Sequence, residues 1–293
     1  MKKSEYRNYM KIFLLAALSY WLGAIFAGLM ILASYNPTTA AAASISPASN
    51  TTSIAYLIYL ILSILAIAVL FKYRKEFLQK LFSRGLLVAS AYYVFGSALI
   101  ILLYSGFAFG APPLTWEIIS LVCGIALSLT WYKTSGAHNF YAVMISIATI
   151  GAIASAFTPF WLLIIFFVMS VWDLIAVFKL KFMQNLAGMA INGNGKRMYP
   201  LFISSGSQSA LHSKLSGDPI QNEPKPALLG LGDLVIPGGF MASAVYFWHV
   251  SFLVGLPMLL LGLLADMWIA TKYNKAIPAL PILFITSVIA VII

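Results

Sequence analysis

The sequence predicts an all-α polytopic membrane protein with nine transmembrane helices, and three observations favour this class. Hydrophobic residues make up 61% of the 293 residues and charged residues only 9%, whereas an ordinary soluble chain has about 25% charged residues. The apolar runs are long enough for a helix to cross roughly 30 Å of hydrocarbon. Basic residues fall in alternate connections between these runs. Together these features exclude a soluble enzyme, a disordered chain and a disulfide-stapled secreted domain.

The nine predicted spans follow one another from near the N-terminus to residue 293. The first has a basic start, as a signal peptide has, but its apolar core exceeds the roughly 7–15 residues of a signal peptide, so we expect it to be retained. Only Thr158 and Pro159 separate the fifth span from the sixth, and proline is favoured at a helix start. The spans cover about 12–34, 53–71, 85–105, 115–131, 140–157, 160–178, 227–247, 250–270 and 276–293.

The basic residues set the predicted orientation. With nine spans, all 18 lysines and arginines lie on one side of the membrane. The positive-inside rule then places the N-terminus in the cytoplasm and the C-terminus outside. The membrane topology accounts for the net charge of +10. We therefore expect the lipid bilayer as a partner of this protein, and no nucleic acid.

The chain divides into three predicted parts. Residues 1–178 form a six-span N-terminal bundle and residues 227–293 a three-span C-terminal part. Residues 179–226 lie between them and are rich in Gly, Ser, Asn and Pro, which is typical of a flexible cytoplasmic loop. We find no internal repeat, which disfavours a duplicated transporter.

Two of the eight acidic residues are predicted to lie inside the membrane. Asp173 comes six residues before Lys179, and Asp233 comes eight residues after Lys225. At 1.5 Å per helical residue, both carboxyls lie roughly 9–12 Å inside the cytoplasmic boundary. An unpaired charge at such depth costs at least about 2.5–3.5 kcal/mol, so two acids at one depth favour a functional site. The alternative is a pair of structural hydrogen bonds.

A third acid near the end of a span has a simpler interpretation. Asp266 lies near the inner end of the eighth predicted span, close to Lys272. We therefore expect its carboxyl at the membrane interface, with no part in a buried site.

Small residues and prolines surround the intramembrane acids. Gly230 and Gly232 allow another backbone to approach beside Asp233, and each weakens a helical turn by up to about 1 kcal/mol. A Pro-Gly-Gly run at 237–239 follows, so we expect this helix to bend or open. At the last span, the two prolines in 278–281 are expected to free backbone groups, which membrane proteins tolerate only in wet cavities or buried sites.

These motifs, in this order, resemble the presenilin and signal-peptide-peptidase family of intramembrane GxGD aspartyl proteases. That family has an acid in the sixth span, Gly-x-Gly-Asp in the seventh and Pro-Ala-Leu at the ninth. The short loop and compact chain resemble archaeal members, and the orientation resembles presenilin. Trp172 departs from the family's usual Tyr and offers only an N–H donor. The matching residues are Asp173, Gly230-Leu231-Gly232-Asp233 and Pro278-Ala279-Leu280.

The resemblance implies an intramembrane aspartic endopeptidase that cleaves transmembrane helices of protein substrates. Asp173 and Asp233 would be the catalytic dyad, with no metal and no cofactor. It further implies a multi-pass protein, expected in the plasma membrane of an archaeon, with its active site near the cytoplasmic side and no obligate partner subunit. The residues expected to contact substrate are Trp172, Gly230, Leu231, Gly232, Pro278, Ala279 and Leu280.

Other classes could use the same acids. A proton-coupled transporter would use Asp173 and Asp233 as a relay. A prepilin-type peptidase also uses a Gly-x-Gly-Asp-like acid, but nine spans and the Pro278-Ala279-Leu280 motif disfavour it. A structural scaffold needs no paired acids. His138, His212 and His249 lack the spacing of zinc ligands, which disfavours a zinc protease.

Overall fold

The computed structural model describes residues 3–34, 85, 88, 118–119, 121–123, 125–126, 138–178, 202–205, 227–273 and 278–293. Within these ranges the chain is helical apart from one short two-stranded sheet. The predicted spans at 53–71, 85–105 and 115–131 lie almost entirely outside the described residues. The elements are α1 (Lys3–Ser34), α5 (His138–Ala156), α6 (Pro159–Phe178), β1 (Phe202–Ser205), β2 (Ala227–Gly230), α9 (Gly232–Phe247), α10 (Phe252–Tyr273) and α11 (Leu280–Ile292).

Four of the described helices are long and apolar enough to cross a membrane. Their apolar stretches are Tyr6–Ile31, Asn139–Ala156, Pro159–Phe178 and Phe252–Tyr273. The apolar helices α9 and α11 are shorter. A mostly helical membrane protein is therefore confirmed, whereas the count of nine spans and the orientation stay predictions.

The break between the fifth and sixth spans lies where the sequence predicts it. The helix α5 ends at Ala156, and α6 begins at Pro159. The carbonyl of Thr158 accepts the N–H of Leu162 at 3.1 Å, so the new helix starts at once. Proline suits this position because it lacks the N–H that a first helical turn leaves unpaired.

The start of the seventh predicted span is a strand instead of a helix. Residues Ala227–Gly230 form β2, which pairs antiparallel with β1, and Phe202 lies opposite Gly230. Strand β1 lies within the 179–226 stretch that we expected to be a flexible loop. The helical prediction failed here because a short apolar run cannot be assigned from periodicity alone.

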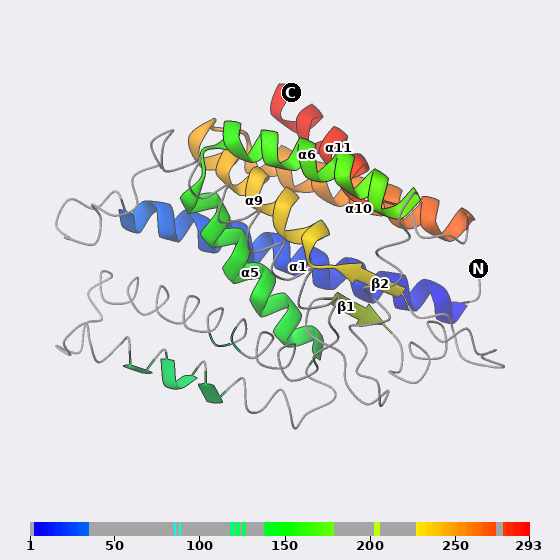
Figure 1. Ribbon diagram of the computed structural model, residues 1–293, viewed down its shortest axis with the longest axis horizontal. Helices are drawn as coiled ribbons and strands as arrows, with labels where there is room; N and C mark the ends of the chain where they lie inside the picture. The colour runs from blue at the N-terminus through cyan, green and yellow to red at the C-terminus, as the bar shows by residue number, and fades with distance from the viewer. Residues whose placement is uncertain are drawn as a thin grey trace.

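The helix α9 lies at the centre of the described fold and packs against α1, α5, α6, α10 and α11 (Figure 1). Its glycines allow this close approach. A methyl group at Gly238 would lie 2.8 Å from Ile150 Cδ1, and one at Gly239 would lie 2.9 Å from Ile153 Cγ2. The helix continues through Pro237 to Phe247, so it does not open at these residues, and the glycines serve close packing.

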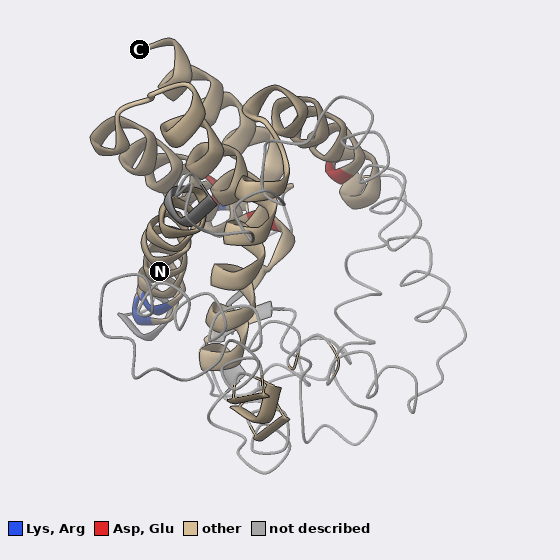
Figure 2. Ribbon diagram, turned by 90° about the vertical axis from the view of Figure 1, so that its left-hand side faces the viewer, with Lys and Arg blue, Asp and Glu red and all other residues tan. Residues whose placement is uncertain are grey.

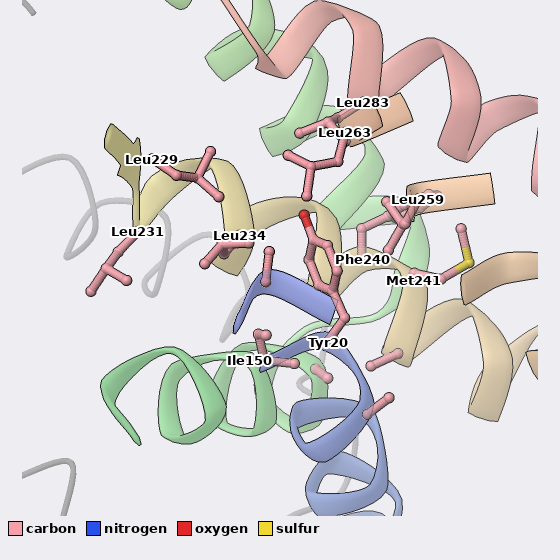
Figure 3. Close-up of a cluster of buried hydrophobic side chains, with 14 of the residues drawn as sticks. Tyr20, Ile150, Leu229, Leu231, Leu234, Phe240, Met241, Leu259, Leu263 and Leu283 are labelled. Atoms are coloured by element: carbon pink, nitrogen blue, oxygen red, sulfur yellow. The ribbon is translucent and has the colours of Figure 1, made fainter. Parts of the chain in front are cut away.

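A buried cluster joins these helices around Tyr20. The ring of Tyr20 extends from α1 among apolar side chains of α5, α9 and α10, and its hydroxyl points toward Leu263 (Figure 3). Tyr20, Ile150, Phe240 and Leu263 are all fully buried. Because apolar burial in lipid adds little driving force, this close packing fixes where α9 lies.

Candidate active site

The side chain of Asp173 is hydrogen-bonded to the first turn of α11. Its side chain is only 5% exposed, and its Oδ2 accepts the N–H of Leu280 at 3.2 Å. The N–H of Ala279 is a second backbone donor to this carboxyl. The first N–H groups of a helix have no partner inside the helix and carry a partial positive charge. The start of α11 thus supplies both hydrogen bonds and a favourable field to the first acid.

The Pro278–Leu280 motif is a buried joint between α6 and α11. All three residues are buried, and Ala279 has helical backbone angles, φ −79° and ψ −37°. The hydroxyl of Ser170, one turn before Asp173, donates to the carbonyl of Phe166 at 2.8 Å and also lies 3.3 Å from the carbonyl of Leu280. We expected free backbone groups in this segment, but the N–H groups of Ala279 and Leu280 are already engaged by Asp173.

Asp233 lies in the first turn of α9, directly after β2. Its side chain is half-buried and accepts a hydrogen bond from the backbone N–H of Gly230. A methyl group at Gly230 would lie 3.2 Å from Asp233 Oδ2, tighter than an ordinary contact. The first glycine of the motif therefore leaves room for the carboxyl to turn back onto the end of the strand.

Tyr20 supplies a hydrogen bond to the backbone carbonyl of Asp233, and our sequence analysis missed this residue. In a helix the carbonyl of Asp233 would accept the N–H of residue 237, but that residue is Pro237 and has no N–H. The Tyr20 hydroxyl donates to this carbonyl at 3.0 Å. A buried carbonyl needs a partner, so Tyr20 replaces the donor that the proline removes. The proline four residues after the acid was the available signal.

Three acids lie within electrostatic range of one another. Asp233 interacts with the charges of both Asp173 and Asp266, and Asp266 interacts with Asp173. In Figure 2 a blue patch marks basic residues at the N-terminal end of α1, and red patches mark acidic residues on other helices. Asp266 is only 7% exposed, so our expectation of an interfacial carboxyl was wrong. Its helix, α10, packs against α11.

The other predicted substrate contacts are spread more widely. Leu231 is buried and its carbonyl accepts the N–H of Val235 at 2.8 Å, so it begins α9. Gly232 is exposed, with open space where a side chain would be. Trp172 is 50% exposed on the outer face of α6, while the next residue, Asp173, points inward. The structure therefore places Gly230 beside Asp233, whereas Trp172 faces away from the two acids.

Within the described ranges, no group of three or more His, Cys, Asp or Glu side chains is arranged to hold a metal ion. The three acids are therefore near neighbours without forming a coordination sphere. His249 is exposed in the turn after α9, and His212 lies outside the described residues. Among the described residues, the groups shown at this site are carboxyl groups and backbone N–H donors.

Comparison with known proteins assigns the family. Residues 17–293 match the family described as "Signal-peptide peptidase, presenilin aspartyl protease". The chain belongs to this family. It is thus an intramembrane aspartic protease, a hydrolase of membrane-embedded proteins. A search of curated proteins finds no match.

Two solved structures share its fold. Both are described as a presenilin family intramembrane aspartate protease, one in space group C222 and one in P2. The first has a TM-score of 0.61 at 18% identity and covers 96% of this chain and 97% of that chain. The second has a TM-score of 0.56 at 18% identity and covers 94% of each chain.

The role of the Tyr20 hydroxyl can be tested by comparison with a second tyrosine, Tyr246. Replacing Tyr20 with Phe leaves the carbonyl of Asp233 without its donor, which costs about 1–3 kcal/mol, and displaces the acid. We expect Tyr20→Phe to lower the melting temperature in detergent and to reduce peptide-bond cleavage about tenfold. Tyr246→Phe removes a comparable hydrogen bond, to the carbonyl of Ala24 at 3.3 Å, and should leave cleavage within twofold.

A second substitution checks the physical reason for that loss. In a Pro237→Ala background the helix regains the N–H that pairs with the carbonyl of Asp233. Tyr20→Phe should then cost less than half as much stability as it does in the parent chain. An equal loss of stability in both backgrounds would contradict the proposed coupling of Tyr20 to Pro237.

Proposed function

We propose that Asp173 and Asp233 form the catalytic dyad that hydrolyses peptide bonds within transmembrane helices of substrate proteins. One observation carries this proposal: two intramembrane acids, from α6 and α9, interact electrostatically and are each anchored by backbone N–H groups. Anchoring by backbone fixes the position of a carboxyl without adding another charge. Such preorganised acids are what a hydrolytic site needs.

The chemistry requires one proton between the two acids. Two nearby carboxyls cannot both ionise readily, so the pair shares a proton and titrates as a unit. The ionised member removes a proton from a water molecule, and that water attacks the substrate carbonyl carbon. The protonated member polarises the carbonyl oxygen and later helps to protonate the leaving amine. We propose no fixed assignment of the two roles to Asp173 and Asp233.

Substrate must unwind before cleavage, because a helix hides its peptide bonds within its own hydrogen bonds. We propose that the sheet of β1 and β2 receives the unwound segment by strand addition, since β2 ends three residues before Asp233. Gly230, Leu231 and Gly232 would then line its path to the acids. We propose that Pro278, Ala279 and Leu280 hold Asp173 in position, because the N–H groups of Ala279 and Leu280 already bind its carboxyl.

The membrane setting completes the proposal. We propose nine spans with the N-terminus in the cytoplasm and the C-terminus outside, in an archaeal plasma membrane. Asp173 lies six residues before Lys179 near the end of α6, which favours an active site near the cytoplasmic side. Transmembrane proteins in the bilayer would be the substrates. No partner subunit is proposed.

Cleavage by the purified chain tests the dyad. The parent chain in detergent should cleave a tagged single-span protein, whereas Asp173→Asn and Asp233→Asn should each lower the rate by at least a thousandfold without unfolding the protein. Glu5→Gln removes an acid far along α1 and is the matched control. Cleavage that survives both dyad substitutions would refute the proposal. If no substrate is cleaved, a vesicle assay for acid-dependent proton flux would favour the transporter instead.

Strand addition predicts how the substrate sequence matters. Proline within the few residues that would pair with β2 removes an N–H and should reduce cleavage more than tenfold. Alanine at the same positions should reduce it by less than twofold. Mass spectrometry of the products would show both the rate and the cleavage position. Equal cleavage of the proline and alanine substrates would contradict pairing with the sheet.

A further inference from the structure

Asp266 on α10 is a buried acid for which the dyad chemistry has no use. Its side chain is 7% exposed, and among the residues that the structure describes its Oδ1 has no hydrogen-bond partner. A buried carboxyl oxygen without a partner is costly, and leucine would fill about the same space with no polar atom to pair. An acid at this position therefore indicates a use for its charge or its proton.

The packing of α10 places the carboxyl of Asp266 beside the start of α11, where Asp173 binds. Gly262 lies one turn before Asp266 on the same face of the helix, and a methyl group there would clash with Thr286 Oγ1 of α11 and lie 3.2 Å from Leu283 Cδ2. The two helices pack against each other and run in roughly opposite directions (Figure 1). One turn forward along α10 therefore corresponds to one turn back along α11, to about residues 279–282. That is the turn whose N–H groups bind Asp173.

Titratable groups on three neighbouring helices, α6, α9 and α1, interact with Asp266. Asp173 on α6 and Asp233 on α9 both interact with its charge, and so does Tyr20 on α1. The α11 sequence, Leu280–Ile292, contains no titratable side chain. On α10 itself the ammonium of Lys272 lies over the ring of Trp268, 4.9 Å from its centroid.

We propose that Asp266 is a third acid of the active site, a positioning residue that shares protons with the catalytic dyad. This inference rests on the proposed function and adds to it. Three carboxyls in a low-dielectric interior cannot all ionise together, so the cluster retains protons that two acids alone would lose. Asp266 thereby preserves the singly protonated dyad at higher pH. It does not touch the scissile bond.

Removing this charge while preserving its shape tests the proposal. We expect purified, full-length Asp266→Asn to cleave the tagged single-span substrate within threefold of the parent rate at its own optimum. The alkaline limb of its kcat/KM profile should move about 0.5–1 pH unit lower, since no neighbouring charge then opposes ionisation of the dyad. Asp266→Glu keeps the charge, so the alkaline limb of its kcat/KM profile should lie at the same pH as in the parent. Glu5→Gln removes the same charge about 22 Å along α1 from Tyr20 and should leave the profile unchanged.

An alkaline limb that is the same in Asp266→Asn and the parent would overturn the inference while the dyad proposal stands. A parent chain without cleavage would overturn both. If Asp266→Asn does not fold, the proposal can be tested by a measurement on the parent chain alone. Unfolded Asp side chains ionise at about pH 4, whereas the buried cluster retains protons up to the alkaline limb, so the melting temperature in detergent should fall as the pH rises toward the limb and level off above it. A melting temperature independent of pH over that range would also overturn the proposal.

Discussion

The structure depends on one constraint: a carboxyl group removed from water needs donors that the fold itself supplies. Asp173 takes them from the first turn of α11, and Asp233 takes one from the end of β2. Both sources are backbone N–H groups at the ends of elements, and in the first turn of α11 they have no partner within the helix. The breaks in secondary structure are therefore what make room for the acids, and the Pro-Ala-Leu and Gly-x-Gly-Asp motifs create those breaks.

The same constraint explains why distant helices converge here. Pro237 leaves the carbonyl of Asp233 without its helical donor, and Tyr20 of α1 replaces it. Gly238 allows the contact, since a methyl group there would lie 3.0 Å from Tyr20 Cδ1. Proline, glycine and tyrosine thus act as one unit that fixes the first turn of α9. The packing of the helical core and the geometry of the second acid cannot be varied independently.

Much of this could be predicted from the sequence, because hydrophobic length and order of motifs are local properties. The helix α6, its acid at 173 and the break before Pro159 follow from such patterns. Strand β2 could not be recognised, since its partner β1 lies more than twenty residues earlier and pairing leaves no local signature. The burial of Asp266 was missed for a similar reason: Lys272 nearby suggested an interface, whereas the packing of α10 on α11 decides which way the acid faces.

The most direct test of a single two-acid site uses a peptide in which a secondary hydroxyl replaces the scissile amide. Its affinity would be measured for the parent, Asp173→Asn, Asp233→Asn and the double variant. If both acids hold one hydroxyl, each single substitution should lose nearly all of the affinity that the double variant loses, because neither acid binds it alone. Losses that add across the two positions would mean that the acids act separately, and would contradict the account.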